Sequence, residues 1–342
     1  MEFDAASQRL HCPFCETQIR VEDYVAPGHK PESDTASQAD ASHGWSEGET
    51  EGMRVYSCGS CGAEIISSET TGSMSCPFCG NNVVAGEQFS GDLKPDYVLP
   101  FQKTKEEAIA GYKSFISGKR LLPKVFSAQN HIDKIRGIYI PYWIYDASID
   151  ADFAFEGTKV RTWSDGKFMY TDTSFYQVER KGRDRFERVP NDASREMPDE
   201  MMESLEPFDH AKAVPFNSGY LAGYDANRYD VAAADVRPRI LERVQTSVIQ
   251  DIRESVQGYA TLSMTRSHME TAELSNKYAL YPVWLLETTW QDQHYLFAMN
   301  GQSGKFVGEL PVSKGRAAVY YLLMGGLFTL LFSAITMAII YL

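Results

Sequence analysis

The sequence predicts an α+β protein with an N-terminal zinc ribbon, a body rich in antiparallel sheet and a single C-terminal transmembrane helix. Two Cys-x-x-Cys pairs lie close together near the start, segments rich in β-branched and aromatic residues fill the middle, and an uncharged apolar run closes the sequence. These observations divide the sequence into five segments, namely 1–25, 26–52, 53–85, 92–312 and 317–342.

The composition argues against one class of function and indicates the chemistry of the cysteines. The sequence has 342 residues, with 46 acidic against 33 basic residues and a formal net charge of −13. Broad nucleic-acid binding relies on cations that neutralise phosphates, so this acidity argues against it. All six cysteines precede residue 80, and their arrangement in pairs indicates metal ligands in a reducing cytoplasm. The acidic start, with no apolar run behind it, predicts no signal peptide.

The main candidate metal site is in the segment 53–85, at Cys58, Cys61, Cys76 and Cys79. Each Cys-x-x-Cys pair wraps a tight turn that directs two sulfurs at one ion, and the Gly after each pair can take a positive φ. Four thiolates at this spacing predict a closed tetrahedral zinc site, which is structural rather than catalytic. A redox dithiol is the competing interpretation, but it needs no second pair. The ribbon is therefore expected to be a rigid platform for a partner.

Cys12 and Cys15 form a third pair, in the segment 1–25, which we interpret as a partial ribbon knuckle. Glu16 replaces the expected Gly, and no second pair precedes it. Two further ligands are then needed, from a partner chain or from His11, His29 or His43. A degenerate knuckle without metal is the equal alternative.

The segment 26–52 is rich in Ser, Glu, Asp, Gly and Ala. Such a composition buries too little apolar surface to offset the entropy of ordering, so it predicts a flexible acidic linker.

The segment 92–312 predicts an α+β body. Thr104 begins a helix with a capping box, and further helices are expected at 128–135, 198–205 and 235–256. Strands are expected at 138–155, 159–163, 168–180, 185–189, 259–267, 278–290, 294–300 and 305–309. Turns are expected at 164–166, 181–183 and 300–304.

A weak internal similarity relates residues 141–148 to residues 282–289, most closely at Pro, Trp and acidic positions. Each copy follows a helical stretch. The similarity predicts two related halves of the body, with chance likeness between strands as the alternative.

The final segment, 317–342, contains no charged residue. As a helix it is roughly 39 Å long at about 1.5 Å per residue, enough to span a bilayer core of about 30 Å. A buried soluble helix is the alternative, although the segment has no polar face. Lys314 and Arg316 stand directly before it. Positive charge on that flank predicts a single-pass, tail-anchored cell-membrane protein whose N-terminal part is cytoplasmic.

Gly325, Thr329, Ser333 and Thr336 form a small, weakly polar stripe along the expected membrane helix. Small residues let helices approach closely in lipid, so the stripe predicts helix packing and a homo-oligomer. The alternative is that small residues are simply common in membrane helices.

No catalytic constellation is found in the sequence. The Gly-Lys pairs at 118–119 and 304–305 lack phosphate-loop spacing, and neither Gly-x-Ser-x-Gly nor His-Glu-x-x-His occurs. The sequence therefore favours a non-enzymatic adaptor. A transcription-linked or nucleic-acid-binding ribbon is one alternative, although Arg54 is the single basic residue between positions 53 and 84. An enzyme that uses the Tyr- and Trp-rich sheet as a pocket is another.

Several motifs occur together with the ribbon. They are Pro-Phe-Asn-Ser-Gly-Tyr-Leu-Ala-Gly-Tyr-Asp at 215–225, Tyr-Pro-Val-Trp at 281–284 and Phe-Ala-Met-Asn-Gly-Gln-Ser-Gly-Lys at 297–305. In these motifs the sequence resembles the bacterial YdjG-like, TFIIB-type zinc-ribbon membrane proteins. The resemblance implies an envelope-stress role in which a membrane anchor recruits phage-shock (PspA-like) and SPFH-domain partners. Members of this family usually open with two ribbons, whereas residues 1–15 resemble only half of the first one.

Overall fold

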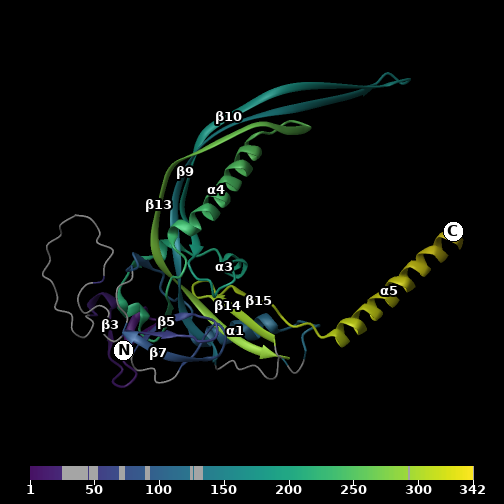
Figure 1. Ribbon diagram of the computed structural model, residues 1–342. Coiled ribbons are helices and arrows are strands. Elements are labelled where there is room, and N and C mark those ends of the chain that lie inside the picture. Colours follow the sequence, from purple (N-terminus) through teal and green to yellow (C-terminus); the bar gives the residue numbers. More distant parts are fainter. Residues whose placement is uncertain are drawn as a thin grey trace.

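Two long antiparallel strands, β9 (Arg136–Ser164) and β13 (Thr261–Trp290), lie at the centre of the protein (Figure 1). The computed structural model describes residues 1–24, 45, 53–68, 74–88, 93–123, 126, 134–291 and 293–341. These residues form the α+β fold with a sheet-rich body that the sequence predicts. The linker expected at 26–52, apart from Trp45, and nearly all of the helix expected at 128–135 lie outside the described residues.

The central pair belongs to a large sheet. Its other strands are β4 (Met53–Ser57), β5 (Glu64–Ser68), β6 (Met74–Ser75), β7 (Asn82–Gln88), β8 (Tyr97–Val98), β10 (Met169–Asp192), β11 (Val214–Pro215), β12 (Asp225–Asn227), β14 (Gln293–Asn300) and β15 (Phe306–Gly308). The order is β11-β8-β13-β9-β12-β5-β4-β7-β6, with β10 beside β9, β14 beside β13 and β15 beside β14. A separate small sheet contains β1 (Glu2–Asp4), β2 (Arg9–His11) and β3 (Gln18–Ile19).

Four α-helices are found in the described part of the chain: α1 (Lys105–Ile116), α3 (Asp199–Leu205), α4 (Ala233–Ser255) and α5 (Lys314–Tyr341). Short 3-10 helices cover Val21–Asp23, His210–Lys212 and Ser218–Leu221. The capping box predicted at Thr104 is confirmed, because its side chain accepts from the Glu107 N–H and the Glu107 carboxylate accepts from the Thr104 N–H. The helix predicted at 235–256 is also found, as α4, and its buried residues Val236, Ile240, Val244 and Val248 give it one apolar face.

The turn predicted at 181–183 is wrong, because β10 runs straight through it. Lys181 and Arg183 face Asp152 and Asp150 on β9, and both pairs form ion pairs, at 3.3 and 2.7 Å. The charges that suggested a loop are therefore cross-strand partners. Likewise β9 and β13 continue through the breaks expected at 156–158 and 268–277.

These continuous strands build a long three-stranded projection, which we call the arm: residues 145–164 of β9, 169–189 of β10 and 261–276 of β13. Figure 1 shows the arm curving away from the body with α4 lying along it. Among the buried residues beneath α4 are Ile149, Phe153 and Phe155 of β9, in the same apolar core as Ile240 and Val244. The amphipathic helix is thus what stabilises the inner part of the arm.

The same order of elements occurs twice in the body: β8, α1, β9 and β10, then β12, α4, β13 and β14. In each set the short first strand pairs in parallel with the long strand of the other set, β8 with β13 and β12 with β9. Each long strand also pairs antiparallel with the strand that follows it in its own set, β9 with β10 and β13 with β14. The pairing reaches Tyr142 on β9 and Val283 on β13. A sequence relationship between the two halves stays a prediction.

Candidate metal centre

The two Cys-x-x-Cys pairs lie in matching turns, one between β4 and β5 and one between β6 and β7. The Gly62 N–H donates to the Cys58 carbonyl, and the Gly80 N–H donates to the Cys76 carbonyl, both at 2.9 Å. Gly62 and Gly80 have φ of 86° and 73°. Glycine takes this left-handed conformation without steric cost, so the two glycines close the turns as the sequence suggests.

The turns bring the four sulfurs together. The Sγ atoms of Cys58 and Cys79 are 3.5 Å apart, those of Cys61 and Cys76 are 3.6 Å apart, and all four lie within 4.8 Å of one another. Metal–sulfur bonds of about 2.3 Å in a tetrahedron place sulfurs roughly 3.8 Å apart. The spacing fits four free thiols around one ion and is too long for a disulfide, whose sulfurs are about 2.05 Å apart.

Burial and hydrogen bonding shift the pKa values of three of these thiols. Partial burial of the thiol group raises the pKa of Cys61 to about 11, and deeper burial raises the pKa of Cys76 still further. Burial also acts on Cys58, but hydrogen bonds from the backbone N–H groups of Cys61 and Ser60 outweigh it and lower the pKa of that thiol to about 7. Thiolates crowded at these distances repel one another, so a bound cation is what lets all of them ionise together. Four thiolates would occupy all four coordination positions of a tetrahedral metal ion and leave none for a substrate.

The strands that carry the cysteine turns, β4 to β7, continue the sheet of the body. β5 pairs with β12 at Ile65 and Ile66, and β12 pairs with the start of β9. Cys58 and Cys76 are buried in one apolar cluster with Val283 and Leu285 of β13. The cysteine cluster is therefore packed into the core of the body and does not form a separate domain.

Arg136, at the start of β9, fixes the second turn to the body. Its Nη1 donates to the Ser75 carbonyl, and its Nη2 pairs with the buried Asp225 carboxylate, both at 2.6 Å. Burial raises the pKa of Asp225, and the Arg136 charge opposes that rise. A carboxylate buried in this way needs its cationic partner. Nothing in the local sequence marked Arg136, because both partners are distant along the chain.

Glu287 of β13 lies directly against the same turn. A Cβ added to Gly80 would stand 2.4 Å from the Glu287 Oε2 atom. The other carboxylate oxygen lies 2.7 Å from Nδ1 of His294. Gly80 is thus needed for its positive φ, and a larger residue at this position would also displace the Glu287 carboxylate.

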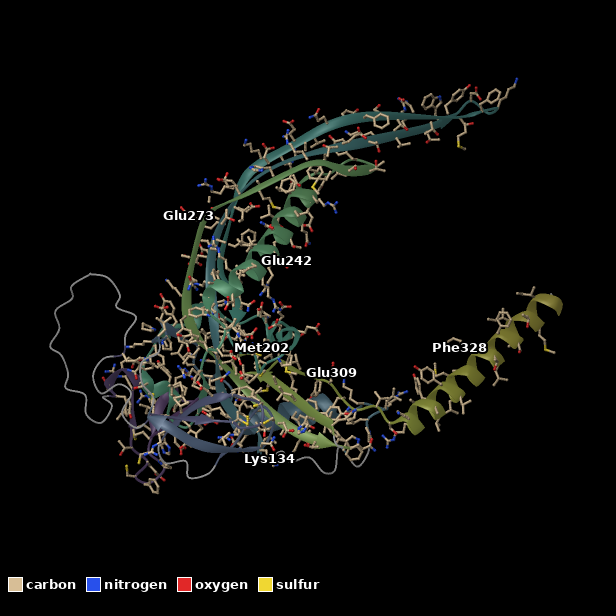
Figure 2. All side chains as sticks on the ribbon, viewed as in Figure 1. Lys134, Met202, Glu242, Glu273, Glu309 and Phe328 are labelled. Carbon is tan, nitrogen blue, oxygen red and sulfur yellow. The ribbon has the colours of Figure 1, made fainter. Side chains whose placement is uncertain are left out.

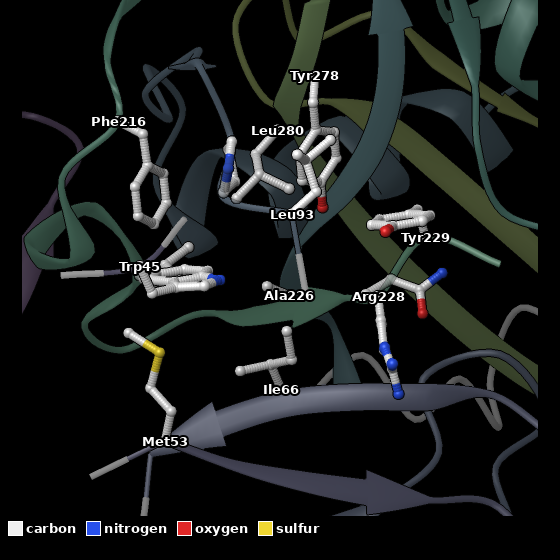
Figure 3. Close-up of a pocket in the computed structure, with 13 residues that line it drawn as sticks. Trp45, Met53, Ile66, Leu93, Phe216, Ala226, Arg228, Tyr229, Tyr278 and Leu280 are labelled. Atoms are coloured by element: carbon white, nitrogen blue, oxygen red, sulfur yellow. The ribbon is translucent and has the colours of Figure 1, made fainter. Parts of the chain in front are cut away.

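A small apolar pocket lies where ribbon and body meet (Figure 3). Met53 of β4, Ile66 of β5 and Ala226 of β12 line it, with Phe216 on another side. The Trp45 ring contributes to the lining and makes an edge contact with Phe216, with ring centroids 5.5 Å apart. Trp45 therefore attaches one point of the expected linker to the junction of ribbon and body.

Cys12 and Cys15 form a knuckle with the same backbone pattern. The Glu16 N–H donates to the Cys12 carbonyl at 2.9 Å, and Glu16 itself takes the positive φ, 58°, that glycine takes in the other turns. Hydrogen bonds from Thr17 lower the pKa of Cys15 to about 7. Within the described residues, however, neither cysteine belongs to a group of three or more possible metal ligands, even when His11 is considered as a ligand. His29 and His43 lie outside the described residues.

At the other end of the chain, α5 is long and apolar enough to cross a membrane, and none of its apolar stretch is buried against the rest of the described chain. Leu322, Phe328 and Phe332 are among its exposed side chains, and Figure 2 shows Phe328 pointing away from the helix into open space. The first turn is attached to the body, since Arg316 Nη1 donates to the Leu122 carbonyl at 2.5 Å. The predicted stripe follows α5, and the hydroxyl of Thr329 donates to the Gly325 carbonyl of the same helix.

The fold and the site thus define an α+β protein with a candidate metal centre in its core and one exposed helix that could cross a membrane. The chain is 30% identical over 315 residues to the uncharacterized protein YdjG of Bacillus subtilis (strain 168), covering 78% of this chain and 92% of that relative. The chain therefore belongs to the YdjG family. No family model matches it, and no solved structure matches it.

Proposed function

We propose that this protein is a non-enzymatic, membrane-anchored adaptor that holds a zinc-stabilised body at the inner face of the cell membrane and recruits cytoplasmic proteins to it. The observation that carries the proposal is the four-cysteine cluster built into the core of the body. Zinc is the ion that four thiolates at ribbon spacing favour. A closed site of this kind stabilises a surface and offers no place for chemistry.

Anchoring through α5 is the second part of the proposal. Lys314 and Arg316 precede the apolar run, and positive charge on that flank favours a cytoplasmic body. From the family resemblance, the candidate partners are PspA-like and SPFH-domain proteins, and the proposed setting is envelope stress.

A cross-linked pull-down of the full-length chain from membranes tests the proposal. The wild type is compared with a Cys76→Ser/Cys79→Ser variant and with a matched Cys12→Ser/Cys15→Ser variant. Specific cytoplasmic proteins captured by the wild type and the matched variant, and lost with the first variant, would support an adaptor that depends on its metal centre. Capture that survives in all three would move the docking surface away from the ribbon. No specific protein in any sample would refute the adaptor function.

A further inference from the structure

The far end of the arm exposes an unusual set of large apolar side chains. We call residues 157–176 the tip, where β9 and β10 join. Its exposed large side chains are Val160, Trp163, Phe168, Met169, Tyr170, Phe175 and Tyr176, of which Phe168, Met169 and Phe175 are 65%, 78% and 67% exposed. Figure 2 shows aromatic side chains standing out from the narrow end of the arm. An exposed apolar patch of this kind marks an interaction site.

The apolar side chains leave the tip on both faces. On one face the rings of Trp163 and Tyr170 are stacked with centroids 5.6 Å apart, and the Arg161 guanidinium lies 5.7 Å from the Trp163 ring. Strand alternation directs Val160 and Phe175 to the opposite face. A flat protein surface would cover one of these faces. A lipid bilayer, by contrast, surrounds an inserted tip on both faces.

The cover that α4 gives to the inner arm does not reach the tip. α4 ends at Ser255, and the Tyr259 ring then packs on Gly157, where an added Cβ would meet it at 2.5 Å. From Gly157 to the end of the arm, the large apolar side chains of the tip are exposed and no other part of the described chain covers them.

The charge of the tip differs from that of the whole chain. It carries the cations Lys159, Arg161 and Lys167 against the carboxylates of Asp165 and Asp172, in a chain with a net charge of −13. The Asp165 carboxylate is already occupied, because it accepts hydrogen bonds from two backbone N–H groups and from the Tyr170 hydroxyl, at 2.8–2.9 Å. The remaining charges are three cations against the single carboxylate of Asp172, and Lys159 and Arg161 also lie over aromatic rings of the arm. This positive excess complements an anionic surface.

We propose that the tip inserts its aromatic side chains into the headgroup region of an anionic lipid bilayer. Trp and Tyr rings prefer this depth, and Lys and Arg beside them interact with lipid phosphates. The arm and α5 leave the body as separate projections (Figure 1), so the tip would be a membrane contact distinct from the anchor. This inference rests on the anchoring part of the proposed function and is independent of partner recruitment.

Tryptophan quenching by brominated lipid tests the contact. The full chain is reconstituted into vesicles of phosphatidylcholine and phosphatidylglycerol whose acyl chains carry bromine. We expect the wild type to show a quenched component that is absent from Trp163→Phe and unchanged in the matched Trp290→Phe variant. A second variant, Phe168→Ser/Met169→Ser, keeps Trp163 and should reduce its quenching, because both changes are at exposed positions that insert. High salt should also reduce the quenching.

Equal quenching of the wild type and Trp163→Phe would overturn the proposal, and tip-dependent self-association of the chain would then point to a second copy as the occupant. A Tyr320→Trp change in the Trp163→Phe chain reports on α5 separately. A quenched Trp at position 320 without quenching at Trp163 would mean that anchoring holds and the tip proposal fails. Absence of quenching at both positions would refute the tip contact and the anchor together.

Discussion

Trp143 and Trp284 occupy equivalent positions on the two central strands and make the same hydrogen bond. The Trp143 indole N–H donates to the Val231 carbonyl at 2.8 Å, and the Trp284 indole N–H donates to the Lys103 carbonyl at 3.0 Å. Each acceptor stands two residues before the first residue of a helix, α4 in one case and α1 in the other. Each indole therefore fixes the helix that precedes the opposite central strand. The two halves are held together reciprocally.

The first prediction concerns these two indoles. Trp143→Phe or Trp284→Phe removes the donor and leaves a carbonyl without its partner beside a side chain that is 4% or 6% exposed. We expect each variant to lose about 1–3 kcal/mol in the free energy of unfolding, measured by urea titration of the full chain in micelles. The same substitution at the exposed Trp163 is the control, with an expected change within about 0.5 kcal/mol. Equal losses at all three positions would show that the hydrogen bonds are unimportant.

Metal removal gives the second prediction. Because β5 of the ribbon pairs with β12, and β12 pairs with β9, chelation should loosen β12 as well as the ribbon. We expect amide hydrogen exchange to accelerate at Asp225–Asn227 after chelation or in Cys76→Ser, while β10 in the arm keeps its protection. Cys12→Ser should retain both the metal and the protection of β12. Unchanged exchange at β12 in the metal-free chain would mean that the centre stabilises the ribbon alone.

The third prediction is a pH dependence at Asp192. This carboxyl group is 6% exposed, and burial, reinforced by the nearby Asp199, raises its pKa from 3.8 to about 7. In the second half of the body the equivalent position, paired with Val283 as Asp192 is paired with Tyr142, is Asn300. An amide is therefore already accepted at this place in the fold.

Because the folded-state pKa is raised, Asp192 favours the folded chain most at low pH, and this contribution is lost as the pH rises from about 4 to about 7. Asp192→Asn cannot ionise. Its free energy of unfolding relative to the wild type should therefore increase between about pH 5 and about pH 8, by roughly 1–4 kcal/mol. Urea titrations at the two pH values measure the change. A constant difference between variant and wild type would show that the carboxyl group is ionised throughout.

The fourth prediction concerns the stripe on α5. A Cβ added at Gly325 or Gly326 meets no described atom within 4 Å, so leucine fits at either position in a single chain. Gly325→Leu together with Ser333→Leu should weaken self-association several-fold if the stripe is a helix-packing face. Energy transfer between labelled chains in vesicles measures the association. Gly326→Leu, one position off the stripe, is the control, and an equal effect of both changes would exclude the stripe as the interface.

Local patterns were sufficient for the features whose physics is local. The capping box at Thr104 and the amphipathic face of α4 depend on residues within a few positions of one another. The cysteine cluster follows the same logic, since each pair closes its own turn and Gly62 and Gly80 supply the required φ. The aromatic tip left a signal of its own, because residues 159–163 and 168–176 place apolar side chains on both faces of the strands.

The sequence by itself determined the α+β class, the four clustered cysteines and the apolar C-terminal helix, because turn geometry, periodicity and hydrophobicity act over short distances. Only the tertiary structure decided that Lys181 and Arg183 belong to a continuous strand, since the carboxylates that they need are on β9. It alone decided that the ribbon joins the body's sheet, through contacts such as that of Arg136 with Ser75. These contacts are made between residues distant in the chain, and no local pattern specifies which distant groups will meet.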